Sequence, residues 1–475
     1  MDVGIARPEF IVGCAAIQVD CLVELTDPDI RLVETGQLQL IRRRRLRRCF
    51  LAPRVELDPQ FALAWVGIAD SHKLLVNYGG FKPNEALAIQ QEAVNHALEI
   101  DPGLGEAYVS LGELHDARGE YEEMEVAFRK AIELSPNYAT AYQWYGNNLG
   151  GGGLSRTQER TDLLRKAAEL DPRSAIIGIN LAGKFATQGL YSRAEQQYKK
   201  VIELNPDFPT TYTTLALFYG LRLGRFDLAI QNTLKALKID PGTPLTPLSM
   251  AMLSLEIGDD AMANQYRQMI ADISDQSWHL GWADVLINAA DGNMDGFREA
   301  WNWTSSRVSN RPSFSHFAAL LELAHGDPAI ARRIYLDAEP DWIIPKAWGP
   351  LVDRDPSTAC LVAWTLTHTG DEEVGTALLN QTLAFFDELP GLIEHADSRD
   401  PQFCYLMAGN TEKALATIET QLAHNHLYGW KIQDQLPMYE QIRFEPRYQA
   451  AMAERDRRIA EQRIIIDQAK AETGL

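Results

Sequence analysis

The residues that most often perform catalysis or bind metals form no recognised pattern in this chain. It has ten histidines, and only His424 and His426 lie close together in the sequence. A His-x-His pair without a third ligand is weak evidence for a metal, and on a helix the two rings would face different sides. The motifs G-x-S-x-G, H-E-x-x-H and a strand-following G-x-G-x-x-G are absent. The sequence therefore predicts a non-enzymatic protein with no metal or cofactor site.

The cysteines and glycines also lack a spacing that would indicate chemistry. An odd number of cysteines leaves at least one unpaired, and no C-x-x-C pair or zinc spacing occurs, so reduced, buried thiols in a cytoplasmic protein are expected. Gly150–Gly153 predicts a flexible turn, because no Lys-Ser or Lys-Thr follows it as in a phosphate loop. No segment approaches the roughly 18 uncharged apolar residues of a membrane helix. The cysteines are Cys14, Cys21, Cys49, Cys360 and Cys404.

Charge and composition limit the class of partner. The chain has 475 residues, 46% of them hydrophobic, and a formal net charge of −20. It is long enough to bury a large core, and its acidity argues against a general affinity for nucleic acid. The exception is Arg42–Arg48, within a basic N-terminal segment of residues 1–53. That run could bind anionic lipid or nucleic acid, but a solvated basic helix or an incorrectly defined start of the gene fits at least as well.

A repeated signature indicates the elements that must position any functional residues. Six near-copies of a Glu-Leu-Asp-Pro motif end in prolines separated by 43, 34, 36, 34 and 35 residues. Such a period is typical of helix pairs that bury their apolar faces only by stacking on one another. In each junction we expect Pro to start a helix and the preceding Asp to cap it. The prolines are Pro59, Pro102, Pro136, Pro172, Pro206 and Pro241.

Residues inside each unit make the pattern specific. In the unit from Gly105, small and aromatic side chains fall at helical spacing, and the units from Ala175 and Pro209 repeat the arrangement. These units resemble the tetratricopeptide repeat. The resemblance implies an all-α, right-handed α-solenoid of helix hairpins, with a regular array over 54–272, degenerate repeats over 273–445 and a capping helix over 446–475. The matching residues of the first of these units are Tyr108, Leu111, Gly112, His115, Tyr121, Phe128, Ala131 and Pro136.

A narrower resemblance concerns a bacterial group. Phe61–Ser71, Asn137–Tyr145 and Phe444–Tyr448 are similar to tetratricopeptide arrays that follow a class III adenylate cyclase or a winged-helix transcriptional regulator. No cyclase metal-binding carboxylates and no winged-helix segment are found in this chain. The resemblance therefore implies a scaffold or sensor module in bacterial signalling or transcriptional regulation. The alternative is the regulatory half of a cyclase or DNA-binding regulator whose output domain is missing from this chain.

Repeat register predicts a binding groove. The second, fifth and ninth residues of each unit, with their neighbours, are expected to line a concave face that binds a basic or amphipathic protein or peptide, not a small-molecule substrate. Glu113→Lys is expected to weaken binding without unfolding the chain. The alternative is that the groove packs against residues 1–53 or the C-terminal helices. The predicted lining is Asp70, Glu106, Val109, Glu113, Asp116, Gln143, Asn147, Asn148, Ile179 and Thr213.

Overall fold

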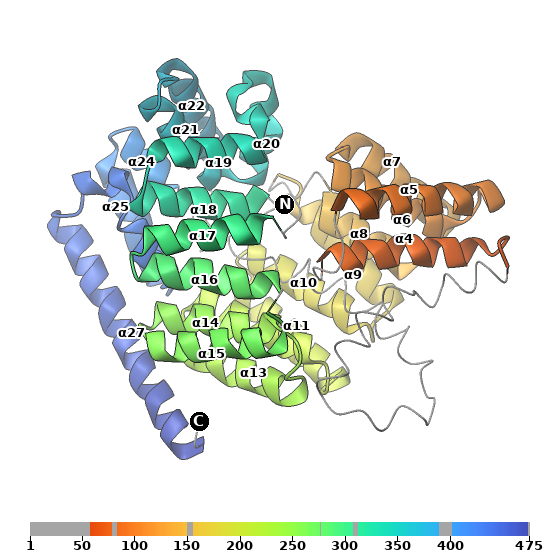
Figure 1. Ribbon diagram of the computed structural model, residues 1–475, viewed down its shortest axis with the longest axis horizontal. Coiled ribbons are helices and arrows are strands. Elements are labelled where there is room, and N and C mark those ends of the chain that lie inside the picture. The colour runs from red at the N-terminus through yellow and green to blue at the C-terminus, as the bar shows by residue number, and fades with distance from the viewer. Residues whose placement is uncertain are drawn as a thin grey trace. The chain divides into compact units, whose positions relative to one another are not determined.

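The computed structural model describes residues 58–77, 83–149, 155–275, 277–306, 312–388 and 401–473 (Figure 1). Helices and turns make up all of these ranges, and no strand occurs in them. The chain divides into two compact units, and the boundary falls inside one helix, between Leu181 and Ala182. The predictions for residues 1–53, Arg42–Arg48 and Gly150–Gly153, and for Cys14, Cys21 and Cys49, lie outside the described residues. The predicted all-α fold of repeated helix hairpins is confirmed.

The smaller unit consists of successive hairpins. Its first helices stack on one another, because α4 contacts α6 and α6 contacts α8, while each also packs on its own partner helix. These are the contacts expected of a repeat array, where each pair buries the apolar face of the next. The helices are α4 (Ala62–Asn77), α5 (Pro83–Ile100), α6 (Gly105–Arg118), α7 (Tyr121–Leu134), α8 (Ala139–Asn148), α9 (Thr157–Leu170) and α10 (Ala175–Thr187).

Repeat junctions differ from the expectation in one respect. The Asp before Pro does not cap the next helix. It follows the end of the previous helix, and its carboxylate accepts a hydrogen bond from a backbone N–H in the turn. Asp101 accepts a hydrogen bond from the Gly103 N–H at 2.9 Å, and Asp240 accepts one from the Gly242 N–H at 2.8 Å. This is an Asx turn, which the short side chain of Asp favours. The next helix begins a few residues later, at Gly105 in the first case.

An aromatic residue in the first helix closes several junctions. Tyr142 OH donates to the carbonyl oxygen of Pro136 at 3.0 Å, and Tyr212 OH donates to that of Pro206 at 3.0 Å. The indole N–H of Trp65 does the same to Pro59 at 3.1 Å. In all three cases the donor lies six residues after the proline. The repeated aromatic therefore fills space between hairpins and also satisfies a turn carbonyl.

The small residue of the repeat lies where two helices touch. A Cβ atom added at Gly112 would come within 2.9 Å of the Phe128 ring on the partner helix. Phe128 is fully buried and stacks on Tyr145 of the next hairpin, with ring centroids 5.6 Å apart. Gly112 therefore lies where the partner helix comes close, and its neighbour there is the Phe128 side chain.

The larger unit continues the same architecture beyond the regular repeats. Helix pairs α12–α13, α14–α15, α16–α17, α18–α19, α21–α22 and α24–α25 pack as hairpins. The elements are α11 (Tyr191–Leu204), α12 (Pro209–Leu217), the π-helical η3 (Phe218–Arg222), α13 (Phe226–Ile239), α14 (Leu245–Glu256), α15 (Asp260–Ile273), α16 (Trp278–Ala290), α17 (Met294–Ser305), α18 (Pro312–His325), α19 (Pro328–Ala338), η4 (Pro340–Ile343), η5 (Pro345–Ala347), α20 (Trp348–Arg354), α21 (Pro356–His368), α22 (Glu372–Glu388), α24 (Gln402–Met407), α25 (Thr411–Ala423), α26 (Trp430–Gln433), η6 (Pro437–Gln441) and α27 (Pro446–Thr473).

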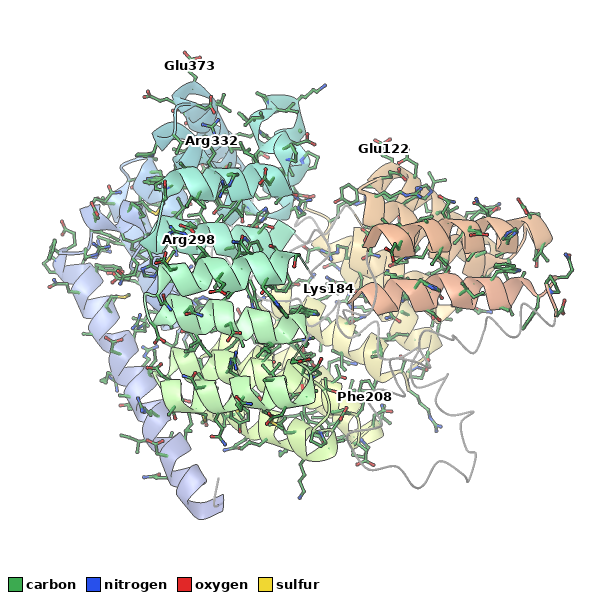
Figure 2. The ribbon with its side chains drawn as sticks, viewed as in Figure 1. Glu122, Lys184, Phe208, Arg298, Arg332 and Glu373 are labelled. Atoms are coloured by element: carbon green, nitrogen blue, oxygen red, sulfur yellow. A yellow bond between two sulfur atoms is a disulfide. The ribbon has the colours of Figure 1, made fainter. Side chains whose placement is uncertain are left out.

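Arginine side chains tie neighbouring hairpins of the larger unit together. Arg298 and Arg332, labelled in Figure 2, each reach the following element. Arg298 forms a two-pronged ion pair with the fully buried Glu322 of α18, at 2.8 and 2.9 Å. Arg332 donates to the carbonyl oxygen of Thr369 at 2.6 Å, past the end of α21. A planar guanidinium suits such bidentate links, which fix the spacing of adjacent helices.

The terminal helix α27 runs back along the larger unit to helices far away in sequence (Figure 1). Its Gln462 side chain accepts a hydrogen bond from the Asp227 N–H of α13 at 3.2 Å. Arg463 donates to the Gly258 carbonyl oxygen at 3.1 Å, just beyond α14. The helix predicted to cap the array therefore also binds its earlier hairpins.

A disulfide joins Cys360 of α21 to Cys404 of α24. Their Cα atoms are 5.2 Å apart, and both residues are fully buried. The expectation of reduced thiols is wrong for these two residues. The spacing of 44 residues gave no signal, because the pairing depends on how α24 packs against α21.

Candidate partner-binding face

Most of the predicted groove residues lie in the smaller unit, on the first helices of its hairpins. Asp70 is on α4, three of the residues are on α8, and four are on α6, while Ile179 is on α10. Thr213 is on α12 of the larger unit. The structure therefore brings together the α4, α6 and α8 residues as one group. We call Asp70, Lys73, Ser110, Glu113 and Asn148 the α4–α6–α8 cluster.

The first contact of this cluster links α4 to α6. Ser110 Oγ donates to Asp70 Oδ1 at 2.6 Å. Burial raises the pKa of the Asp70 carboxyl to about 6, although the Ser110 hydrogen bond and the Lys73 charge both act to lower it. The Tyr138 pKa is also raised, first by burial and then by the nearby negative charges of Asp70 and Glu106. The site therefore holds a carboxyl group that changes charge near neutral pH.

The second contact links all three helices through Glu113. Its side chain is only 2% exposed, accepts a hydrogen bond from Asn148 of α8 and pairs with Lys73 of α4. The Lys73 ammonium also lies 4.2 Å from the centroid of the Trp144 ring, in a cation–π contact. Repeat register did not identify Lys73, Ser110 or Trp144. The signal for Lys73 was its place three residues after Asp70 on one helix, where the two side chains share a face.

Buried amide groups without partners form the third feature. Among the described residues, Gln143 Nε2 and Asn147 Oδ1 on α8 have no hydrogen-bond partner. The Oδ1 and Nδ2 atoms of Asn180 on α10 also have none. Asn180 is fully buried, and Gln143 is 4% exposed. Buried polar groups are normally paired, so these three amides are exceptions that call for an explanation. Asn180 was missed from the sequence because it is not at a predicted lining position.

Burial corrects the expectation that the lining is open. Only Asp70, Glu106 and Asn147 of the ten predicted residues are partly exposed. Thr213, for example, is 1% exposed and shares a hydrogen bond with Thr246 of α14 at 3.2 Å. Adjacent first helices pack side by side, and this contact covers positions that a single repeat would leave free. The buried residues are Val109, Glu113, Asp116, Gln143, Asn148, Ile179 and Thr213.

This burial also changes what Glu113→Lys would do. A lysine at this position would place a second buried cation beside Lys73 and remove the acceptor of the Asn148 amide. An unpaired buried charge costs several kcal/mol, on the order of the whole stability of a domain. Glu113→Lys is therefore a folding variant, and it does not test binding alone.

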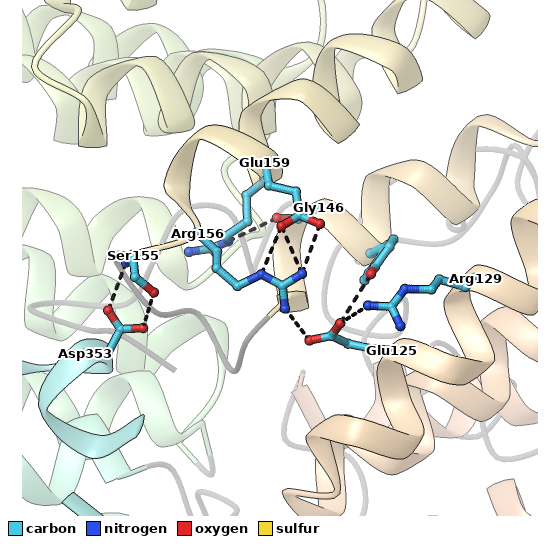
Figure 3. A network of polar contacts seen from close by, with 9 residues as sticks. Glu125, Arg129, Gly146, Ser155, Arg156, Glu159 and Asp353 are labelled. Carbon is cyan, nitrogen blue, oxygen red and sulfur yellow. Dashed lines mark hydrogen bonds and ion pairs between the residues drawn. The ribbon is translucent and has the colours of Figure 1, made fainter. Parts of the chain in front are cut away.

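A separate ionic network supports the hairpins from their second helices (Figure 3). Arg156 Nη1 donates to Glu125 Oε1 at 2.5 Å, and its other nitrogens donate to Glu159 at 2.9 Å. Glu125 also pairs with Arg129 on its own helix. Burial acts to lower the pKa of Arg156, but the two glutamates outweigh it and the pKa is raised. The network fixes α7 against α9 and has no unpaired group to offer a ligand.

The two histidines of the His-x-His pair have different surroundings. His424 is exposed and its Nδ1 lies 2.8 Å from the Thr420 carbonyl oxygen, whereas burial lowers the pKa of His426 to about 4. Within the described ranges, no group of three or more His, Cys, Asp or Glu residues is placed to hold a metal ion. In the same ranges, no helix combines the length and apolar character that a membrane span needs.

Comparison with known sequences supports the repeat assignment. The sequence profile of the tetratricopeptide repeat matches residues 105–138 and 209–243, which contain the α6–α7 and α12–α13 hairpins. Anaphase-promoting complex subunit 3 of Schizosaccharomyces pombe is 30% identical over 112 residues, 24% of this chain and 16% of that protein. The mitochondrial import receptor subunit TOM70 of Homo sapiens is 23% identical over 250 residues, 51% of this chain and 41% of TOM70. The chain thus spans less than half the length of these two relatives.

A bacterial relative and two solved structures are also similar. The type IV pilus assembly protein PilF of Pseudomonas aeruginosa is 27% identical over 186 residues, 37% of this chain and 70% of PilF. The structure of the pilus biogenesis factor PilW is 22% identical and covers 42% of this chain and 90% of its own, with a TM-score of 0.35. The Cut9–Hcn1 structure is 17% identical in sequence. The match covers 70% of this chain and 66% of the matched chain, with a TM-score of 0.41. The profile therefore identifies tetratricopeptide repeats at residues 105–138 and 209–243, and the described residues around them form further helix hairpins.

Proposed function

We propose that the smaller unit is a non-enzymatic scaffold that binds an extended segment of a partner protein along the first helices of its hairpins. The observation that supports this most directly is Asn147 of α8, a partly exposed residue whose Oδ1 atom has no hydrogen-bond partner among the described residues. A side-chain amide presents a donor and an acceptor, which is what a peptide backbone needs in order to pair with it. Leaving the Asn147 acceptor unpaired costs stability, and an N–H group of a bound backbone would recover that cost.

The charge of the same face favours a basic residue in the bound segment. Asp70 and Glu106 are partly exposed acids, whereas Glu113 is already neutralised by Lys73. A Lys or Arg of the partner beside Asp70 would stabilise the ionised carboxylate, since an opposite charge lowers the pKa of an acid. The proposed ligand is therefore a basic or amphipathic segment, in keeping with the net charge of −20.

A peptide library displayed on phage and selected on the full chain tests this function. We expect peptides with a basic residue near one end, and fluorescence polarisation should give tenfold or more weaker binding to Asn147→Ala. Asn264→Ala is a matched control, because Asn264 is an exposed residue whose amide already donates to its own helix. Equal loss of affinity in both variants, or no selected peptide at all, would contradict the proposal.

The biological setting rests on sequence resemblance. We propose a scaffold in bacterial signalling or transcriptional regulation, or alternatively the regulatory half of an adenylate cyclase or DNA-binding regulator with its output domain elsewhere. Relatives named as an import receptor subunit and a pilus assembly protein support protein binding in general. Cyclic AMP formation by the native complex, or promoter binding by it, distinguishes the two alternatives from a free scaffold.

The cytoplasmic location expected from the sequence also stands as a proposal, and the disulfide weighs against it. Disulfides persist in oxidising compartments and are rare in the cytoplasm. Alkylation of thiols in protein taken directly from its host, followed by mass spectrometry of the Cys360 and Cys404 peptides, decides the matter. Two alkylated thiols would support a reducing compartment, and an intact bridge would contradict it.

A further inference from the structure

In the larger unit, the face made by the first helices of three hairpins is covered by a segment from much later in the chain. The apolar cluster that spans α14 to α18 includes Met252, Trp282 and Phe314 from the first helices, together with Ile270 of α15 and Phe297 of α17. Tyr428 and Ile432 pack against this cluster, although they follow α25 in the sequence. The short helix α26, to which Ile432 belongs, contacts α18 directly. We call residues 425–436 the inserted segment.

The inserted segment is mostly irregular and is held chiefly by its apolar side chains. Its one helix has four residues, and Leu427 and Leu436 are almost completely buried. The Gly429 N–H donates a hydrogen bond to Glu256 Oε2, at the end of α14, at 3.2 Å. An irregular stretch with so little helix opens more readily than a core helix.

Two left-handed residues shape the segment. Asn425 has φ = 64° and Gly429 has φ = 81°, so the chain reverses direction at both places. The Asn425 amide donates to the Leu223 carbonyl oxygen in the turn before α13. A Cβ atom at Gly224 would collide with the Asn425 carbonyl oxygen, so a residue without a side chain is required there. The α12–α13 turn is thus shaped to accept this loop.

The segment is also tethered at both ends. On one side, the disulfide at Cys404 anchors α24 to α21, and α24 packs on α25. On the other side, Tyr448 of α27 donates to the Asp434 carboxylate at 2.6 Å. A tethered segment has a high effective concentration at its own site, so it rebinds quickly after leaving and competes with ligands in solution.

We propose that the inserted segment is an internal ligand: it occupies a partner-binding face of the larger unit, and a partner segment of the same chemistry displaces it. The partner would present an aromatic and an aliphatic residue on either side of a turn, as Tyr428 before Gly429 and Ile432 in α26 do. It would meet a face built mainly from Trp, Phe and Leu, residue types that are enriched at the centres of protein interfaces. The proposal concerns a different unit from the proposed function and stands independently of it.

The test uses the full chain and a fluorescein-labelled peptide with the sequence of residues 424–437. In the double variant Tyr428→Ala/Ile432→Ala the tethered competitor is weakened, so the labelled peptide should bind at least ten times more tightly than to wild type. Gln435→Ala, at an exposed position of the same segment, should bind like wild type. Asn147→Ala, in the smaller unit, should also leave this affinity unchanged, which separates this proposal from the first. Peptide affinity unchanged in the folded double variant overturns the proposal.

A second measurement applies if the double variant does not fold. Hydrogen exchange of wild-type protein should show amides of residues 425–436 exchanging through an opening that leaves α14 and α16 protected. Exchange of these amides only together with those two helices overturns the proposal, because the segment would then be part of the cooperative core.

Discussion

At the scale of single residues, the distinction that matters is between buried polar groups that are paired and those that are not. Glu113 and Asn148 satisfy each other, whereas the Asn180 amide has no partner among the described residues. Removing a paired group leaves its partner buried and unsatisfied, while removing an unpaired one relieves a cost. The sequence could not make this distinction, since both kinds of residue are polar side chains on similar helices.

Replacing Asn180 by Leu should therefore stabilise the smaller unit. The change removes two unpaired polar atoms at nearly constant volume, and we expect the free energy of unfolding to rise by about 1 kcal/mol. Urea denaturation followed by circular dichroism measures it. Asn148→Leu is the contrasting variant. It removes the donor that satisfies the buried Glu113 carboxylate, so the free energy of unfolding should fall by about 1–3 kcal/mol. If both variants shift stability in the same direction, the pairing pattern described here is wrong.

Asp70 should make the free energy of unfolding fall as the pH rises, which is the opposite of the usual effect of an Asp. Its pKa in the folded protein is about 6, against 3.8 for the unfolded reference. The folded state therefore binds more protons between these values, and the stabilising effect of protonation is lost as the pH rises through 6. Asp70→Asn, which keeps an acceptor for Ser110, should be more stable than wild type at pH 7 by about 1–3 kcal/mol. Thermal denaturation from pH 4 to 7.5 should show this difference vanishing near pH 4; a constant difference would contradict the assignment.

At the scale of elements, local rules explain the hairpins and long-range packing explains the links between them. The Asp-Pro turn and the aromatic donor six residues after the proline recur because each needs only neighbouring residues. These features were visible in the sequence, although the role of Asp was assigned to the wrong helix. The bridge between α21 and α24 was not visible, because no local pattern reports how two helices 44 residues apart pack.

Loss of the disulfide should destabilise the larger unit. Closing a loop of this length removes chain entropy from the unfolded state worth about 4 kcal/mol. We expect Cys360→Ala/Cys404→Ala to unfold at a clearly lower urea concentration than wild type under non-reducing conditions. With a strong reductant and denaturant present, the two proteins should converge. Because both sulfurs are buried, reductant alone should act slowly on the folded protein, and rapid reduction without denaturant would contradict the burial.

At the scale of the whole molecule, the last helix of the larger unit, α27, contacts α13 and the turn after α14. Asp227 and Gln462, separated by 235 residues, share a hydrogen bond, and Arg463 reaches Gly258. An open array gains stability only from neighbouring repeats, whereas these contacts couple α13 and α14 to α27. The unit should therefore respond as one body to a change in its terminal helix.

Three consecutive isoleucines on α27 test that coupling with a matched control. Ile466 is 3% exposed, whereas Ile464 is 58% exposed. Ile466→Asp buries an unpaired charge and should cost about 3 kcal/mol, and it should speed hydrogen exchange in α13 and α14. Ile464→Asp should change stability by less than about 0.5 kcal/mol. Exchange that speeds up only within α27 would show that the terminal helix is not coupled to the earlier hairpins.

The sequence by itself determined the helix hairpins and their repeat, because the proline positions and the spacing of small and aromatic residues depend on residues within one period of 34. It also predicted a candidate face, whose residues lie on the first helices of successive hairpins. Only the tertiary structure decided which of those residues are covered, that Lys73 neutralises Glu113, that Cys360 meets Cys404, and that Tyr428 and Ile432 cover the α14–α16–α18 face. These outcomes depend on the angle and register with which whole hairpins stack, and small changes at each junction add up over many repeats.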